Sequence, residues 1–200
     1  VITPSATSPA LTEGKNLHFI FRTIGRDDQQ GPAAAKFIIN KAKPKKVAVL
    51  HDKQSYGQGI AASVRDELKK ANVEVALFEG INAGDSDYSA VITKLKSAGA
   101  DFVYYGGYHP EMGLLLRQAA EQGLKVRMMG PEGVGNPEIN AIAGNAVEGM
   151  LVTLPADPAS KPENAALVKA FKDKGRDASG AFQMGAYTAT QVLAQSIKAV

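Results

Sequence analysis

Short apolar runs alternate along the chain with segments whose apolar residues recur at helical spacing. Each run is short enough to form one strand; the runs are Val47–Leu50, Val73–Phe78, Phe102–Tyr105, Val126–Met129 and Met150–Val152. An intervening segment has apolar residues on one helical face, in the series Tyr88, Val91, Ile92 and Leu95. Because parallel neighbouring strands need a crossover connection, usually a helix, the alternation predicts an α/β fold with a mostly parallel sheet flanked by helices.

Residues that favour helix ends support this interpretation. Two more helical series are Ile60, Val64, Leu68 and then Met112, Leu115, Leu116, Ala119. We expect helices to begin at Gly31–Pro32, since proline suits a first turn, and after Asp85–Asp87, whose carboxylates suit an N-cap. Glycines that favour the C-terminal ends of helices follow three of the predicted helices, and they are Gly99, Gly123 and Gly144.

The two ends of the chain depart from the regular alternation. Near the N-terminus, Val1–Thr3 and Leu17–Thr23 predict strands joined by a loop rich in Pro, Ser and Thr. Near the C-terminus, Pro162–Lys174 and Ser179–Ala199 predict two helices with no strand after them. These ends therefore do not complete a strand–helix unit of their own.

We expect three segments along the chain. Residues 28–154 are predicted to form one nearly complete lobe, and residues 1–27 and 155–200 to be parts of something larger. The stretch Pro155–Pro158 has the composition of a crossover between the two.

Composition excludes several classes of function. The 200 residues carry a formal charge of only +3, and the one basic run, Lys41–Lys46, is interpreted as a solvated helix end and not as a nucleic-acid-binding surface. The chain has no Cys, which excludes disulfides, thiolate nucleophiles and iron–sulfur clusters. No apolar stretch approaches the ~18–20 residues that span a bilayer, so we expect no membrane insertion. The chain begins at Val1 without a signal-like segment, and we therefore expect a processed or excised chain.

The loops that follow the predicted strands carry the candidate chemistry. In open α/β sheets ligands bind beyond the carboxyl ends of the strands. The loops there are His51–Gly57, Gly106–Glu111, Gly130–Gly135 and Thr153–Asp157. The connections at the opposite edge, such as Lys69–Asn72, carry only turn-forming and solubilising residues. This asymmetry predicts a site at one edge of the sheet, formed by Tyr56, Tyr108 and Glu132.

Each of these residues also has a purely structural interpretation. Tyr56 could pack against the sheet at the start of its helix, and the glycines before Tyr108 could serve a tight turn. Glu132, with Gly133 beside it, has no Lys or Arg nearby in the sequence. Its carboxylate either points into solvent or meets a cation that the chain does not supply, such as the amine of a ligand.

Catalytic and metal-binding patterns are weak. The pair His51–Asp52 could act as a general base, although an aspartate at a strand end more often caps the next helix. His109 and Glu111 lack a third metal ligand, so we expect no metal site. The chain has no G-x-S-x-G, P-loop or H-E-x-x-H motif. Aromatic and acidic groups without a nucleophile are typical of a protein that holds a small molecule, so we expect neither catalytic residues nor a cofactor.

Three segments together carry a family resemblance. Phe102–Gly113, Met129–Gly135 and His51–Gly57 resemble the periplasmic leucine/isoleucine/valine-binding proteins, which are type I solute-binding proteins of ABC transporters. The similarity extends over essentially the whole chain. It implies a Rossmann-like fold in which residues 28–154 are the second of two lobes, while residues 1–27 and 155–200 are remnants and crossovers of the first.

The resemblance also implies a role for individual residues. Ser5, Ala6 and Thr7 correspond to the first-lobe loop that binds the α-carboxylate of the amino acid, with Ser5 in place of a small apolar residue of many relatives. Phe182 falls where the family has an aromatic residue near the side-chain pocket, although Gln183–Met184 departs from the bulkier pattern of that stretch.

In the second lobe, the resemblance assigns the other charge of the ligand. Tyr56 and Tyr108 correspond to residues that close over it, and Glu132, beside Gly133, matches the acid that pairs with the α-ammonium group. A dehydrated zwitterion needs a partner for each charge.

The resemblance implies that the protein binds a small free amino acid of the branched-chain type (Leu, Ile or Val) and delivers it in the periplasm to an ABC-type permease. Hinges are expected at Gly25–Asp28 and Thr153–Pro158. One alternative is a sensor domain of the same fold for another amide or carboxylate. Another is an NAD(P)-type oxidoreductase fragment, although Gly57-Gln-Gly59 lacks the third glycine of a phosphate-binding turn. We also expect self-association or exchange of elements, because segments 1–24 and 165–200 lack a sheet to cover them.

Overall fold

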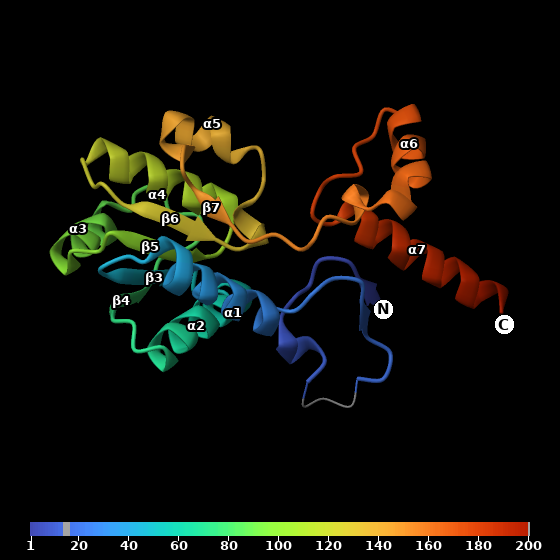
Figure 1. The fold of residues 1–200 in the computed structure, drawn as a ribbon, viewed down its shortest axis with the longest axis horizontal. Helices are drawn as coiled ribbons and strands as arrows, with labels where there is room; N and C mark the ends of the chain where they lie inside the picture. Colours follow the sequence, from blue (N-terminus) through green and yellow to red (C-terminus); the bar gives the residue numbers. More distant parts are fainter. Residues whose placement is uncertain (14–16, 200) are drawn as a thin grey trace. The chain divides into compact units, whose positions relative to one another are not determined.

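The structure, a computed structural model, describes residues 1–13 and 17–199 (Figure 1). The chain divides into two compact units: unit 1 comprises residues 1–26 and 154–200, and unit 2 comprises residues 27–153. Val200, the last residue of the predicted segment 155–200, lies outside the described residues. Each unit is described by itself below.

Five parallel strands form the centre of unit 2, in the order β4-β3-β5-β6-β7. Their bounds are β3 (Val47–His51), β4 (Val75–Gly80), β5 (Phe102–Gly106), β6 (Arg127–Gly130) and β7 (Leu151–Val152). In the register of the central strands, Leu50 lies opposite Tyr105, and Tyr104 lies opposite Met129. The predicted parallel sheet is confirmed.

Helices cover both faces of this sheet, as Figure 1 shows. They are α1 (Asp27–Phe37), its π-helical continuation η2 (Ile38–Ala42), α2 (Ser55–Lys70), α3 (Ser89–Ala98), α4 (His109–Glu121), η3 (Glu132–Val134), α5 (Ile139–Ala143) and η4 (Gly144–Val147). Alternate residues of a strand face opposite sides of the sheet. Val49 and Tyr104 therefore belong to the core cluster under α1 and α2, whereas Leu50 and Tyr105 belong to the cluster under α3, α4 and α5.

The predicted start of the first helix was wrong. Helix α1 begins at Asp27, so Gly31 and Pro32 lie inside it. Asp27 and Asp28 place negative charge in the first turn, where the helix dipole favours it, and Pro32 removes only one backbone hydrogen bond. Gly31 serves a different purpose from the one expected: a Cβ there would lie 2.3 Å from Ser63 Oγ, so the glycine allows close contact with α2.

Unit 1 contains a small parallel sheet and two helices. Its elements are β1 (Ile2–Thr3), η1 (Pro9–Leu11), β2 (Phe21–Arg22), η5 (Pro158–Ser160), η6 (Pro162–Asn164), α6 (Ala165–Asp173) and α7 (Gln183–Lys198). The strand predicted at 17–23 is only Phe21–Arg22, because its partner β1 is equally short. The helix predicted at 179–199 begins at Gln183, because Asp177 accepts the backbone N–H of Ser179 and holds a turn before it.

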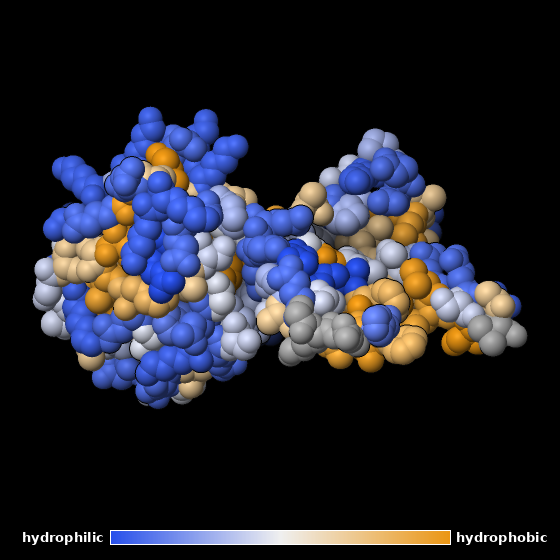
Figure 2. Space-filling view, turned by 90° about the horizontal axis from the view of Figure 1, so that it is seen from below, coloured by the Kyte–Doolittle hydropathy of each residue, from blue (hydrophilic) through white to orange (hydrophobic). Residues whose placement is uncertain are grey.

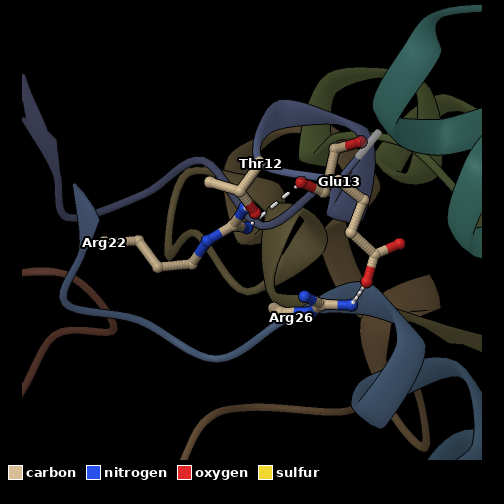
Figure 3. Close-up of polar contacts among 5 residues, drawn as sticks. Thr12, Glu13, Arg22 and Arg26 are labelled. Atoms are coloured by element: carbon tan, nitrogen blue, oxygen red, sulfur yellow. Dashed lines mark hydrogen bonds and ion pairs between the residues drawn. The ribbon is translucent and has the colours of Figure 1, made fainter. Parts of the chain in front are cut away.

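Arg22 organises the N-terminal loop of unit 1. Its guanidinium donates to the carbonyls of Ala6 and Ser8, each at 3.1 Å, and to Thr12 Oγ1 at 2.8 Å. Figure 3 shows this last bond beside the ion pair between Arg26 and Glu13. One side chain of β2 thereby fixes the backbone that follows β1.

None of the helices in the described residues is both long and apolar enough to cross a membrane.

Candidate functional site

Three of the predicted site residues lie at the carboxyl end of the sheet of unit 2. Tyr56 is the second residue of α2, which follows β3, and Tyr108 directly precedes α4, which follows β5. Glu132 begins the short helix η3 after β6. Because these strands are parallel neighbours, their following loops meet at one edge.

The structure brings these three side chains together. The Tyr56 hydroxyl donates a hydrogen bond to Glu132 Oε1 at 2.8 Å. The rings of Tyr56 and Tyr108 lie with their centroids 5.3 Å apart at an interplanar angle of 41°. The two phenols therefore form a tilted aromatic pair beside a carboxylate.

Glu132 is buried without a cationic partner among the described residues. The residue is only 6% exposed, and its Oε2 atom is buried with no hydrogen-bond partner among the described residues. A buried carboxylate is costly unless it is paired. The arrangement is therefore suited to a group that brings its own positive charge.

Both phenols remain hydrogen-bond donors at neutral pH. Burial, followed by the negative charge of Glu132 and its hydrogen bond, raises the pKa of Tyr56 far above its ordinary value. Burial also raises the pKa of Tyr108, with smaller effects of Asp52, Glu132 and Asp27. A cation placed here would face neutral aromatic rings and one carboxylate, an arrangement that cation–π attraction favours.

Gly133 allows the close approach that assembles this site. A Cβ at this position would lie 2.6 Å from the carbonyl oxygen of Gly107, and 3.2 Å from ring atoms of Tyr56 and Tyr108. Any larger residue would push the loop after β6 away from the loop after β5. The glycine next to Glu132 is thus a packing requirement of the site.

Unit 1 holds the other predicted site residues. Thr3 Oγ1 accepts the backbone N–H groups of Ser5 at 3.3 Å and of Ala6 at 3.0 Å, which fixes the loop. Ser5 is exposed, whereas Thr7 is buried with a hydroxyl that has no hydrogen-bond partner among the described residues. The loop therefore holds one buried hydroxyl that is not engaged elsewhere in the described chain.

Phe182 lies half-buried immediately before α7. Near its start, α7 contacts the N-terminal segment of unit 1. The Thr23 hydroxyl donates to the carbonyl of Gly185 at 2.9 Å, and a Cβ at Gly185 would lie 3.6 Å from the carbonyl oxygen of Pro4. Phe182 thus directly precedes a helix that is anchored beside the loop that contains Thr7.

The residues considered for catalysis, His51 and Asp52, and for metal binding, His109, make structural contacts instead. His51 Nδ1 accepts the N–H of Lys53 at 3.1 Å, and Asp52 Oδ1 accepts the N–H of Gln54 at 2.9 Å, so both shape the turn before α2. His109 Nε2 lies 3.2 Å from Glu138 Oε2. In residues 1–13 and 17–199, no group of three or more His, Cys, Asp or Glu residues has an arrangement that could hold a metal ion.

Sequence reasoning missed two residues near the carboxylate. Asp27, only 3% exposed, begins α1 and raises the pKa of Tyr56. Tyr104 is completely buried in β5, and Glu132 and Asp27 act on its pKa. The sequence pattern placed Asp27 in an expected hinge, Gly25–Asp28, before the predicted start of the first helix, and it placed Tyr104 in a buried apolar strand.

Comparison with known proteins gives the class to which this fold and site belong. A family model described as "Periplasmic binding protein" matches residues 1–200, and the chain belongs to this family. Its fold is that of the type I periplasmic binding proteins: the leucine binding protein of Thermotoga maritima superposes with a TM-score of 0.87 at 30% identity, covering 98% of this chain and 56% of that one. The family and these relatives are named as binding proteins, not as enzymes.

Curated relatives narrow the comparison further. The leucine-, isoleucine-, valine-, threonine- and alanine-binding protein of Pseudomonas aeruginosa is 58% identical over 99% of this chain and 53% of its own length. The Leu/Ile/Val-binding protein of Escherichia coli is 51% identical over 96% of this chain and 52% of its own length. The chain spans about half the length of the curated relatives it matches.

Proposed function

We propose that the full-length, two-lobed protein binds a free amino acid, with leucine, isoleucine and valine as its ligands. The observation that carries the proposal is Glu132, a buried carboxylate with one hydrogen-bonded oxygen and, among residues 1–13 and 17–199, no partner for the other oxygen and no cation beside it. The α-ammonium group of an amino acid supplies the missing charge. The ligands named for the relatives agree with this choice.

The roles of the individual residues follow from their chemistry. In the proposal, Glu132 pairs with the ammonium group, and Tyr56 and Tyr108 present their rings to it. Gly133 keeps the loop close enough for this contact. Cation–π attraction of this kind contributes roughly 0.5–2 kcal/mol.

Unit 1 would bind the opposite end of the ligand. Thr7 would donate its buried hydroxyl to the α-carboxylate, and the N–H groups of Ser5 and Ala6 would turn to it in place of Thr3 Oγ1. Phe182 would contribute an aromatic surface to the ligand side chain. Each charge of the zwitterion then has a partner when it leaves water.

We assign residues 28–154 to the second lobe, and residues 1–27 and 155–200 to the first lobe and its crossovers. The hinges proposed at Gly25–Asp28 and Thr153–Pro158 include the two points at which the chain passes between units 1 and 2. Ligand binds the closed state better than the open state and shifts the population toward it. An ABC-type permease would then recognise the closed, loaded form.

The family supports a location in the periplasm, where such a protein can carry its ligand to a membrane permease. A sensor domain of the same fold that binds a different amide or carboxylate is the alternative. The transport protein and the sensor domain differ in which ligands they bind. They also differ in whether the bound protein acts through a membrane permease.

We further propose that the 200-residue chain by itself associates with a second copy. Unit 1 exposes a set of large apolar side chains, which we call its apolar surface: Val1, Phe19, Phe21, Val192, Leu193 and Ile197. Figure 2 shows hydrophobic residues, coloured orange, on the surface of unit 1 among polar residues. Exposed apolar surface of this kind favours association in water.

Calorimetry on the full-length protein tests the main proposal. Leucine, isoleucine and valine are titrated, with 4-methylpentanoate as the matched ligand that keeps the carboxylate and side chain of leucine but lacks the ammonium group. We expect the amino acids to bind far more tightly than the deaminated analogue. Equal affinity for leucine and 4-methylpentanoate would remove Glu132 as the ammonium partner.

A further inference from the structure

The buried hydroxyl of Tyr104 has no function in the site described so far. Tyr104 is 0% exposed and is among the largest fully buried side chains of the protein. Its hydroxyl has no hydrogen-bond partner among the described residues. A buried hydroxyl without a partner is costly, so its position in the core needs an explanation.

The position of Tyr104 in the sheet directs it to the Glu132 side of the site. Tyr104 lies opposite Met129 in β6, three residues before Glu132, and opposite Val49 in β3. It shares its core cluster with Val49 and Met129, on the face covered by α1 and α2. The residue that donates to Glu132, Tyr56, stands at the start of that same α2.

The electrostatic environment identifies the same neighbour. After burial, the negative charge of Glu132 is the largest cause that raises the pKa of Tyr104, and the charge of Asp27 comes next. Tyr104 in turn contributes to raising the pKa of Tyr56. The charge of the Glu132 carboxylate thus acts on the phenol of Tyr104 across buried surroundings, where electrostatic interactions are strong.

Glu132 has a buried acceptor that lacks a hydrogen-bond donor. Tyr56 satisfies Oε1, whereas Oε2 is buried without a partner among the described residues. The Tyr104 hydroxyl and Glu132 Oε2 are thus a buried donor and a buried acceptor that make no direct bond, and an internal water can bridge such a pair.

We propose that Tyr104 is a positioning residue for Glu132: its hydroxyl donates, through one bridging water, to Oε2 and holds the carboxylate in the orientation that receives the ligand ammonium. This inference rests on the proposed function for its effect on affinity. The bridge itself exists in the protein without ligand. Tyr104 then supports Glu132 from the core, as Tyr56 does from the start of α2.

The neighbouring residue provides a matched control. Tyr105 is also completely buried, and its hydroxyl makes no hydrogen bond of standard geometry among the described residues, although the backbone N–H of Tyr108 is close enough to lower its pKa slightly against the effect of burial. It faces the opposite side of the sheet, and after burial the largest causes that raise its pKa are the charges of Glu111 and Asp52. Tyr104→Phe and Tyr105→Phe each remove one buried hydroxyl from adjacent positions, but only the first removes the proposed bridge.

Two measurements on the full-length protein test the assignment. The first is the carbon-13 NMR resonance of the Glu132 carboxyl group without ligand, identified by its loss in Glu132→Gln. We expect Tyr104→Phe to shift this resonance and Tyr105→Phe to leave it in place. The second is calorimetry, in which we expect Tyr104→Phe to weaken leucine binding roughly tenfold, with unchanged affinity in Tyr105→Phe.

The outcomes separate this inference from the proposed function. An unshifted Glu132 resonance in Tyr104→Phe, or an equal shift in both variants, overturns the role of Tyr104 whatever the ligand. Weaker binding in both variants by the same factor also overturns it, because a general loss of packing then explains the effect. If the unmodified protein binds no amino acid, the proposed function fails, and the resonance still decides whether Tyr104 supports Glu132.

Discussion

The Tyr56 hydroxyl and Glu132 Oε1, 2.8 Å apart, join the start of α2 to the loop after β6. This bond connects two segments of the sequence that meet only because β3, β5 and β6 are parallel neighbours. It satisfies one carboxylate oxygen, whereas the other makes no direct hydrogen bond within the described chain. Predictions for the site begin from this pair.

Replacement of Glu132 should have the largest effect on ligand binding. Glu132→Gln in the full-length protein should weaken leucine binding at least a hundredfold, because breaking a buried charge pair costs ~3–5 kcal/mol. Calorimetry measures the change. Glu138→Gln is the control, since that side chain is 76% exposed and should leave affinity unchanged. Retained affinity in Glu132→Gln would contradict the assignment.

The hydroxyl of Tyr56 should matter more than that of Tyr108. Tyr56→Phe keeps the ring but removes a hydrogen bond to a charged group, which contributes ~1.5–3 kcal/mol, so leucine should bind roughly tenfold or more weakly. Tyr108→Phe keeps the aromatic pair and should change affinity little, whereas Tyr108→Ala should weaken it by loss of the ring. Titration calorimetry that ranks Tyr108→Phe as the more damaging of the two hydroxyl deletions would refute this order.

Gly133 should tolerate no side chain. Gly133→Ala places a Cβ 2.6 Å from the Gly107 carbonyl oxygen, and relief of such overpacking typically costs ~1–3 kcal/mol. We expect lower stability in urea denaturation together with weaker leucine binding. Gly59→Ala, in α2 with nothing within 4 Å of the added Cβ, is the control, and it should be stabilising by up to ~1 kcal/mol. Equal behaviour of the two variants would disprove the packing requirement.

Asp52 should lower stability at neutral pH. Burial is the main cause that raises the pKa of this carboxyl above 3.8 in the folded protein. The folded state therefore holds the proton more tightly, and this contribution to stability is present below pH 3.8 and lost as pH rises through the folded pKa. Asp52→Asn keeps an acceptor for the N–H of Gln54 and should be more stable than the unmodified protein at neutral pH, with a difference that shrinks in acid.

Asp66 should affect the pH dependence of stability in the opposite direction to Asp52. Its hydrogen bond with Arg65 is the first cause that lowers the pKa of this exposed carboxyl. Asp66→Asn should therefore lose a small stabilisation at neutral pH, and the loss should disappear as pH falls. Denaturation in urea at several pH values measures both variants, and a destabilised Asp52→Asn at neutral pH would count against the prediction.

The 200-residue chain alone should associate in solution. Its helix α7 exposes Leu193 and Ile197, which are 48% and 76% exposed. The double variant Leu193→Gln, Ile197→Gln should reduce association and the binding of an apolar dye. Light scattering that finds the unmodified chain monomeric at high concentration, with no dye bound, would exclude the proposed self-association.

The sequence pattern predicted the elements of unit 2 well, because uniformly apolar runs and apolar residues at helical spacing both reflect burial directly. Val47–Leu50 and Phe102–Tyr105 are uniformly apolar since helices cover both faces of the strands, and Gly99 ends α3 with a φ of +66°, as its position after a helical series predicts. The start of α1 was missed because Pro32, which suits a first turn, lies inside the helix, and because Gly31 meets Ser63 of a different helix. No local pattern records such a contact.

For the site, sequence could bring Tyr56, Tyr108 and Glu132 to one edge of the sheet because topology alone determines that edge. It could not distinguish Tyr104 from Tyr105, which are adjacent, both apolar in context and both completely buried. Only the face of the sheet on which each phenol lies separates them. The depth of Glu132 likewise depends on how tightly three loops pack, which a sequence does not state.

Unit 2 interrupts unit 1 along the sequence, and this affects the entropy of assembling unit 1. Unit 2 is a single continuous stretch, whereas unit 1 is assembled from residues 1–26 and 154–200, on either side of it. Gln30 Nε2 donates to the carbonyl of Thr153 at 3.0 Å and ties the beginning of unit 2 to its end. Once unit 2 has folded, the separated parts of unit 1 are joined by a short structured link instead of a long random coil, and the entropy lost on bringing them together falls accordingly. Early formation of the inserted unit therefore makes completion of the split one easier.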